Sequence, residues 1–310
     1  MFGFSRPQAI AFLLMTAMVV VSPAVFYPVF LMKVLCFALF ACAFNLLIGY
    51  VGLLSFGHAA YFGMGSYVAA YAAKTWGFTP ELAIVAGGVT GAVLGTVFGW
   101  LAIRRQGIYF AMITLALAQM NFFVCVEAPF TGGEDGIQQI PRGALFGLIP
   151  LTNDLVMYAV IAVIFLFGFL LIHRIVNSPF GQVLKAIREN ELRTISLGYR
   201  TDDYKLLAFI LSAAIAGVAG GAKAIVFGVA TLTDVDFSMS GEVLLMSLLG
   251  GLGTIFGPVM GALVLSSMEN YLAPFGAWVT VTQGVIFVAC VLAFRRGIIG
   301  EIGAKLRIAL

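Results

Sequence analysis

The sequence predicts an all-α, polytopic transmembrane helical bundle with about eight full spans and one broken pair, or about ten helices. The 310-residue chain is 62% hydrophobic and only 10% charged, whereas a soluble domain carries about 25% charged residues. Apolar runs of about 20 residues, long enough to cross a bilayer, recur from end to end. No long polar stretch could form a second domain, so residues 1–310 are expected to form a single transmembrane domain.

Full spans are expected wherever an apolar run lies between polar or Gly- and Pro-rich turns. They are predicted at 8–27, 29–49, 51–73, 81–103, 107–128, 154–173, 206–228 and 277–294. The first run follows Arg6 without a clear cleavage site of small residues, which favours an uncleaved helix over a signal peptide. The long run 243–272 has glycines and a proline at its centre, which weaken a helix strongly. It therefore predicts two short helices that meet at the glycines.

The basic residues favour one orientation in the membrane. Of the 17 Lys and Arg residues, all except Lys33, Lys74, Arg142 and Lys223 fall on one side if the spans alternate and the broken pair crosses an even number of times. Basic residues near span ends mark the cytoplasmic side. Both termini and segment 174–205 are therefore expected in the cytoplasm, with loop 129–153 outside.

Several classes of site are excluded by what the chain carries. Its four cysteines lie inside apolar runs without metal-ligand spacing, which predicts small core or lipid-facing side chains and no metal site. No basic patch stands apart from the spans, which argues against nucleic-acid binding. There is no G-x-x-x-x-G-K-[ST] loop, so energy for uphill transport would come from another chain. Ser55 and His58 have no nearby acid in the sequence, and no catalytic residue is assigned.

Segment 178–198 predicts a short amphipathic helical unit. Ser178 suits an N-cap, Pro179 the first helical position and Gly198 a C-terminus. Apolar residues follow at three- and four-residue spacing, and the polar part alternates Lys and Arg with Glu. A helix on lipid headgroups would need a basic polar face. The mixed charge instead favours a groove on a protein partner.

The stretch GYVGLLSFGHAAYFGMGSYVAAY (49–71) places many glycines at membrane depth. They have two readings: close helix packing, or irregular backbone that lines a pathway. Ser55 and His58 are expected to share one helix face. The echo between GYVGLLSFG (49–57) and GGLGTIFG (250–257) suggests two broken helices at corresponding places. The pathway candidates are Asn45, Ser55, His58, Thr114, Gln119, Gly253 and Gly257.

Five stretches carry a resemblance to a known family. They are NLLIGYVGLLSFGHAAYFGMGSYVAA (45–70), RRQGIYFAMITLALAQM (104–120), TGGEDGI (131–137), SPFGQVLKAIRENELRTISLGY (178–199) and LLGGLGTIFGPVMGA (248–262). Together, and in this order, they resemble the LivM-type permease subunits of branched-chain amino-acid ABC importers, from about residue 30 to 296.

The resemblance implies a bacterial inner-membrane protein without a cofactor of its own. Its implied partners are a second, non-identical permease of the LivH type, two cytoplasmic ABC ATPases that bind ATP, and a periplasmic amino-acid-binding protein. It also implies an ATPase-coupling segment that contains Gly181, Ala186, Arg188, Glu189, Asn190, Glu191, Arg193 and Gly198. The outer loop that would face the binding protein contains Thr131, Gly132, Gly133, Glu134, Asp135 and Gly136.

Two other readings of the transport function stay open. Importers of urea and short amides use near relatives of the same permease, so the motifs specify the family better than the substrate. An ion-coupled secondary transporter would instead need acids deep in the membrane as ion sites. Glu127, Glu242 and Glu269 are expected near span ends, which argues against that reading.

Overall fold

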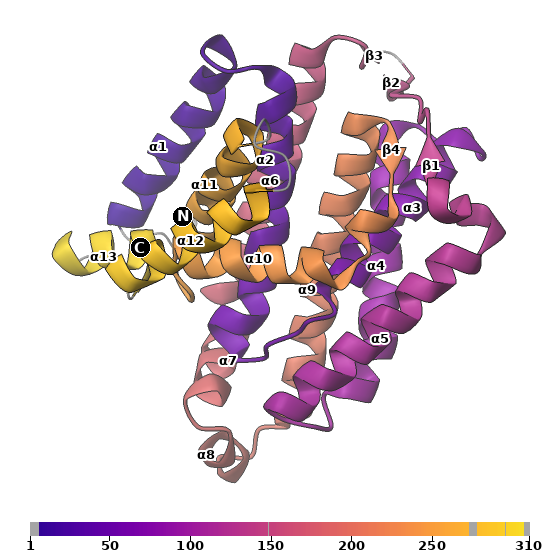
Figure 1. Cartoon of the computed structure of the whole chain (residues 1–310). Helices are drawn as coiled ribbons and strands as arrows, with labels where there is room; N and C mark the ends of the chain where they lie inside the picture. Colours follow the sequence, from indigo (N-terminus) through magenta and orange to yellow (C-terminus); the bar gives the residue numbers. More distant parts are fainter. Residues whose placement is uncertain (1–5, 148, 273–277, 295, 307–310) are drawn as a thin grey trace.

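The structure, a computed structural model, describes residues 6–147, 149–272, 278–294 and 296–306. Over these residues it is almost entirely helical, which confirms the predicted all-α class (Figure 1). The remaining residues lie outside the described part. They include the extreme ends of the chain, the first residue of the span expected at 277–294, and Arg295 and Arg307 of the basic C-terminal segment.

Ten apolar helices form the bundle in the described part of the chain, and short elements cover its ends. The apolar helices are α1 (Arg6–Val21), α2 (Pro28–Asn45), α3 (His58–Lys74), α4 (Pro80–Ala102), α5 (Ile108–Glu127), α6 (Asp154–Val176), α9 (Thr201–Phe227), α10 (Phe237–Gly250), α11 (Gly257–Leu272) and α12 (Trp278–Ala293). The short helical elements are η1 (Ser22–Ala24), the π-helix η2 (Leu46–Val51), η3 (Pro129–Thr131), η4 (Gly133–Asp135), α7 (Pro179–Glu189), α8 (Glu191–Ser196), η5 (Leu232–Asp234) and α13 (Gly297–Leu306).

Six of the described helical segments are long and apolar enough to cross a membrane by length and composition. They are Pro7–Ala24, Pro28–Val51, Pro80–Ala102, Ile108–Glu127, Asp154–Val176 and Thr201–Phe227. The helix expected at 51–73 begins only at His58, because Gly52 adopts a left-handed conformation with φ 83° and the chain stays non-helical up to residue 57.

Local sequence accounts for where several helices begin and end. Pro28, Pro80 and Pro179 each occupy the first turn of a helix, where the missing N–H costs no hydrogen bond. α9 ends at Phe227, and the φ of 68° at the following Gly228 takes the chain out of the helix. The ends of these helices are therefore set by local sequence.

Helix α2 lies at the centre of the bundle, and every residue from Val34 to Asn45 is buried. It packs against α6, α9, α10 and α11. Beside it, α3, α4 and α9 approach closely through glycines. A Cβ on Gly65 of α3 would lie 2.6 Å from the Cα of Gly217 in α9, and one on Gly87 of α4 would lie 2.8 Å from the carbonyl oxygen of Gly65. Close backbone approach of this kind is a common use of glycine in membrane helices.

The run 243–272 forms two helices, α10 and α11, joined at residues 251–256, which confirms the predicted broken pair. α10 runs across the front of the bundle in Figure 1 and contacts α2, α3 and α11. α10 therefore packs against both the central helix α2 and helix α3.

The two long loops lie at opposite ends of the bundle (Figure 1). At one end, which we call the α8 end, α7 and α8 project beyond the apolar helices. At the other, the β4 end, strand β1 (Ile137–Gln138) pairs with β4 (Val229–Ala230) antiparallel, and β2 (Ala144–Leu145) pairs with β3 (Ile149–Pro150). Loop 129–153 thus caps the β4 end, and segment 174–205 caps the α8 end.

Candidate functional site

Two segments of irregular backbone interrupt the helices and lie against each other. The first break, residues 46–57, consists of the π-helical turn η2 and a non-helical stretch. The second break, residues 251–256, joins α10 to α11. A Cβ on Gly49 would lie only 2.8 Å from the backbone nitrogen of Gly253, so the two backbones touch there. The structure therefore brings together the two glycine-rich stretches that the sequence pattern linked.

The side chain of Asn45 joins the two breaks. Its amide nitrogen donates to the carbonyl oxygen of Thr254 at 2.9 Å, and its amide oxygen accepts from the backbone nitrogen of Gly253 at 3.0 Å. Asn45 is only 2% exposed. A side-chain amide can donate and accept at once, so it pairs two neighbouring backbone groups that have left the helix. Asn45 thus holds the second break against the end of α2.

Ser55 and His58 lie in different structural elements, so the prediction that they share one helix face is wrong. Ser55 is in the non-helical part of the first break, where its hydroxyl accepts from the backbone nitrogen of Gly57 at 3.2 Å. His58 is the first residue of α3. The reason is the left-handed backbone at Gly52, which ends the helical run before Ser55.

His58 lies among aromatic rings in the interior. Its Nε2 is 2.9 Å from the hydroxyl of Ser212, which donates to the carbonyl oxygen of Ala43 at 2.5 Å. The rings of Phe44 and Tyr61 meet the imidazole edge to face, at centroid distances of 5.0 and 5.5 Å. His58 is 0% exposed. In this arrangement it links α3 to α9 and α2.

Three other pathway candidates lie near the breaks or on α5. Thr114 accepts at its hydroxyl from the backbone nitrogen of Phe56 at 3.2 Å, so it secures the first break to α5. Gly257 begins α11 and donates its N–H to the hydroxyl of Thr254 at 3.1 Å. Gln119 is half-buried on α5, and its side chain makes no hydrogen bond to another residue of the described part.

The amphipathic unit at the α8 end is two helices that meet at Asn190. Ser178 caps α7 by accepting from the backbone nitrogen of Gly181 at 3.3 Å, and Asn190 caps α8 by accepting from that of Arg193 at 3.0 Å. Gly198, with φ 92°, follows the end of α8, as predicted for a helix C-terminus. The capping prediction for Ser178 is confirmed, and the division at Asn190 was not predicted.

The inner face of α7 packs on the bundle. Gly181, Leu184 and Ile187 are buried, and a Cβ on Gly181 would lie 2.5 Å from the carbonyl oxygen of Ile175 at the end of α6. Glycine at this position therefore lets α7 lie directly on α6. The exposed coupling candidates are Ala186, Arg188, Glu189, Asn190, Arg193 and Gly198.

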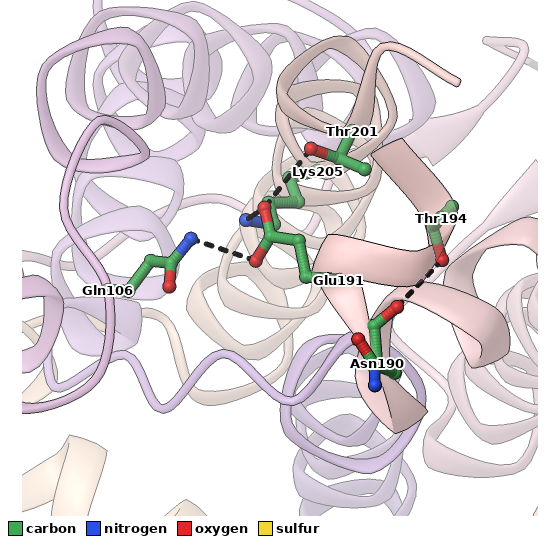
Figure 2. A network of polar contacts seen from close by, with 6 residues as sticks. All are labelled: Gln106, Asn190, Glu191, Thr194, Thr201 and Lys205. Carbon is green, nitrogen blue, oxygen red and sulfur yellow. Dashed lines mark hydrogen bonds and ion pairs between the residues drawn. The ribbon is translucent and has the colours of Figure 1, made fainter. Parts of the chain in front are cut away.

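A carboxylate network fastens α8 to the bundle, as Figure 2 shows. Glu191 pairs with Lys205, whose side chain is only 3% exposed, and accepts from the hydroxyl of Thr201 at 3.1 Å. Its other oxygen accepts from the amide of Gln106 at 2.9 Å. Three donors within the chain therefore hold the Glu191 carboxylate against the bundle.

The outer-loop candidates build a turn whose acids face outward. Thr131 is buried and donates to the carbonyl oxygens of Cys125 and Ala128, at 2.6 Å each. The three glycines Gly132, Gly133 and Gly136 have positive φ, which few other residues adopt readily. Glu134 and Asp135 are exposed between them. The loop therefore presents two carboxylates at the β4 end.

Two ion pairs involve lysines that the charge count had set aside as exceptions. Lys33 of α2 lies 2.9 Å from Glu269 of α11, and Lys223 of α9 lies 2.7 Å from Asp234 of η5. A charged residue inside a membrane segment usually pairs with another charged group. Lys33 and Lys223, each inside an apolar run, therefore indicated in the sequence that an acid lies nearby. Glu242, expected near a span end, lies inside α10.

Among the residues that the structure describes, no group of three or more His, Cys, Asp or Glu side chains could hold a metal ion. The candidate site consists of the contact between the two breaks, which we call the joint, and of the amphipathic cap formed by α7 and α8 at the α8 end. Hydrogen bonds between elements hold the joint together, and the cap presents exposed side chains at the α8 end.

Comparison with known proteins gives a consistent result. The sequence profile of a family described as the branched-chain amino acid transport system / permease component matches residues 28–294. This range contains both breaks, α7 and α8. No solved structure matches the chain.

Individual relatives carry related names. The high-affinity branched-chain amino acid transport system permease protein LivM of Salmonella typhimurium is 27% identical over 278 residues, which cover 82% of this chain and 65% of that protein. LivM of Escherichia coli K12 matches to the same extent. The corresponding LivH protein of Salmonella typhimurium is 25% identical over 285 residues, or 86% of this chain and 91% of LivH. The chain thus spans about 65% of the length of the LivM relatives.

Proposed function

Because this chain belongs to the family of branched-chain amino acid transport system permease components, we propose that it is the membrane-spanning permease subunit of an ABC importer for branched-chain amino acids. The observation that carries the proposal is the match over residues 28–294, which includes the broken helices and the amphipathic cap in one continuous range. The chain is a multi-pass membrane protein by the same family membership and by its six candidate spans.

In this proposal, ATP is bound and hydrolysed by separate ATPase subunits that contact the α8 end. Two exposed charged residues at this end, Glu189 of α7 and Arg193 of α8, support this assignment because their charges are mixed. Mixed charge suits a protein groove better than anionic lipid. The α8 end would then lie in the cytoplasm.

A second, non-identical permease of the LivH type and a periplasmic amino-acid-binding protein complete the proposed importer. The binding protein would meet the β4 end, where Glu134 and Asp135 are exposed. The chain's similarity to both LivM and LivH proteins supports a pair of related permeases. Complementary charge at such a contact speeds association more than it adds affinity.

We place the translocation pathway beside the two breaks. Irregular backbone at membrane depth is tolerated only where it is buried in protein or lines a wet cavity. Along the first break, Gly52, Leu54 and Phe56 are exposed or half-buried, whereas Leu53 and Ser55 are buried. The alternation gives this segment one outward side. A pathway would pass that side, with Ser55 and His58 behind it in the protein.

The function is tested by reconstituting the complex of this chain with the ATPase, permease and binding-protein products of neighbouring genes. Proteoliposomes loaded with ATP should take up leucine, isoleucine or valine when the loaded binding protein is added. Uptake of urea or acetamide in place of the amino acids would identify the amide-importer alternative. Uptake that needs an ion gradient and no ATP would identify a secondary transporter and refute the proposal.

A further inference from the structure

Arg188 reaches from α7 to the first break. Its guanidinium donates from Nη1 to the carbonyl oxygen of Gly49 in η2. The helix ends at Val51, so carbonyl groups in its last turn need hydrogen-bond donors from outside the helix. A basic side chain at a helix C-terminus also interacts favourably with the helix dipole. Arg188 meets both requirements from a separate helix at the α8 end.

The stem of Arg188 lies against the same break. A Cβ on Gly52 would lie 3.3 Å from the Cγ of Arg188, and Gly52 has a φ of 83°. A glycine at this position therefore gives both the left-handed turn and the room for the arginine stem. In Figure 1 the non-helical part of the first break runs from beside α7 towards α3, and α7 contacts η2.

The same guanidinium also lies beside the second break. A Cβ on Gly253 would lie 3.0 Å from Nη1 of Arg188 and 3.1 Å from the carbonyl oxygen of Gly49. Arg188 is thus placed where the two breaks touch. Since Asn45 hydrogen-bonds the second break to the end of α2, the two breaks and the arginine form one joint.

A second basic residue of α7 approaches the first break. The ammonium group of Lys185 lies 5.8 Å from the ring centroid of Tyr50, within range of a cation–π interaction. One turn before Lys185, on the same face of α7, Gly181 sits directly on the end of α6. Helix α7 therefore contacts the first break through two side chains, and Arg188 alone of these two also lies beside the second break.

We propose that Arg188 is a positioning residue that transmits displacement of α7 to the joint between the two breaks, so that residues 46–57 and 251–256 shift together. The inference rests on the proposed function, because a partner ATPase must displace α7. In this proposal α7 is linked to the joint by the hydrogen bond from Arg188 to Gly49 and by the packing of the Arg188 stem on Gly52. Helix α8 is anchored separately, because Glu191 contacts α9 and Gln106.

The test uses the reconstituted complex with Arg188→Met, which keeps a long apolar stem and loses the donor, and with Arg188→Lys, which keeps the charge. The matched control is Arg105→Gln, which removes one charge from an exposed residue at the same end. We expect Arg188→Met to assemble and to hydrolyse ATP at the wild-type rate. Uptake should fall about tenfold, a change typical of lost coupling between sites. Arg188→Lys should recover part of the uptake, and Arg105→Gln should match the wild type.

A labelling experiment separates a positioning role from a purely structural one. Leu54→Cys places a thiol on the half-buried side of the first break, in a chain whose native cysteines Cys36, Cys42, Cys125 and Cys290 are replaced by alanine. With Arg188 present, the rate of reaction with a water-soluble maleimide should differ between the nucleotide-free and vanadate-trapped complexes. With Arg188→Met, the rate should no longer depend on nucleotide.

The outcomes distinguish this inference from the proposed function. If the wild-type complex takes up no branched-chain amino acid, the proposed function fails and the labelling result alone decides the role of Arg188. If the wild type transports and Arg188→Met retains both wild-type uptake and nucleotide-dependent labelling, only the inference is overturned. Loss of ATP hydrolysis or of assembly in Arg188→Met, with Arg105→Gln intact, would also overturn it, because the residue would then serve binding or folding.

Discussion

Replacing Asn45 by alanine should loosen the joint between the two breaks without removing either one. The change deletes the hydrogen bond to Thr254 at 2.9 Å and the one from Gly253 at 3.0 Å. It leaves a backbone donor and a backbone acceptor without those partners. No other side chain hydrogen-bonds to either of these two backbone groups in the described part of the chain.

The loss in free energy of unfolding depends on how exposed the backbone groups of Gly253 and Thr254 are. Interhelical hydrogen bonds in membrane proteins average about 0.6 kcal/mol, which sets a lower value of about 1 kcal/mol for two. A fully buried group left unpaired costs about 1–3 kcal/mol, which would raise the total to as much as about 6 kcal/mol. Gly253 and Thr254 are half-buried, so water can replace part of what is lost. We therefore expect the free energy of unfolding to fall by about 2 kcal/mol.

The assay is thermal unfolding of the purified protein in detergent, with Thr90→Ala as the matched control. Thr90 also donates to a backbone carbonyl, but to Ala86 within its own helix. At about 2 °C per kcal/mol for a large chain, Asn45→Ala should lower Tm by about 4 °C and the control by less than about 1 °C. Equal shifts in the two variants would refute the reasoning, because the second break would then be held by something other than Asn45.

Three further predictions concern orientation, an ion pair and a packing contact. In a cysteine-free chain, Glu134→Cys should react with an impermeant maleimide in intact cells and Leu192→Cys, at a position 79% exposed, only after permeabilisation. Asp234→Ala should lower the free energy of unfolding by about 3–5 kcal/mol, because Lys223 loses its partner in a pair whose side chains are only 12% and 3% exposed; chemical denaturation measures this. Gly65→Val should prevent accumulation of folded protein on size-exclusion chromatography, because even a Cβ there lies 2.6 Å from a backbone atom of α9.

The ion-pair prediction and the packing prediction each have a variant that should behave like the wild type. Arg200→Gln removes one member of an ion pair with Asp203, whose side chains are 85% and 60% exposed, and pairs so exposed contribute little. Gly241→Ala adds a Cβ in a helix where no neighbouring atom lies within 4 Å. Labelling in the opposite order at the two cysteine positions would reverse the proposed orientation. Full stability of Asp234→Ala would contradict the ion-pair argument, and full stability of Gly65→Val would contradict the packing argument.

Much of the fold could be predicted because membrane helices carry their main signal locally. Length and apolar composition marked the spans, and Pro28 and Pro80 marked helix starts. The broken pair could also be predicted, since glycines at the centre of an apolar run weaken a helix there. The late start of α3 at His58 was not predicted, because the left-handed φ at Gly52 interrupts an apolar run that otherwise looks continuous.

The candidate site was harder to predict, because its contacts join distant positions. Asn45 and Gly253 were both candidates, but nothing in the sequence indicates that one hydrogen-bonds to the other. His58 was selected as a polar group at membrane depth, and its partner Ser212 was not considered. Glu191 was selected as part of a partner surface, and its three donors within the chain were not predicted. A polar residue type can be read from the sequence, whereas its partner requires the fold.

The glycines of the stretch 49–71 serve two purposes. Some allow close packing of helices, and others shape the first break. Gly63 and Gly65 allow close backbone packing of α3. Contacts of this kind extend over whole helices, so they cannot open one at a time. Gly49 and Gly52 instead shape a break that is joined to its surroundings by a few hydrogen bonds, each worth about 0.5–1.5 kcal/mol. Segments with few such contacts open at the lowest free energy. A partner that displaces α7 would therefore act on the breaks first, and the bundle of α3, α4 and α9 would stay intact.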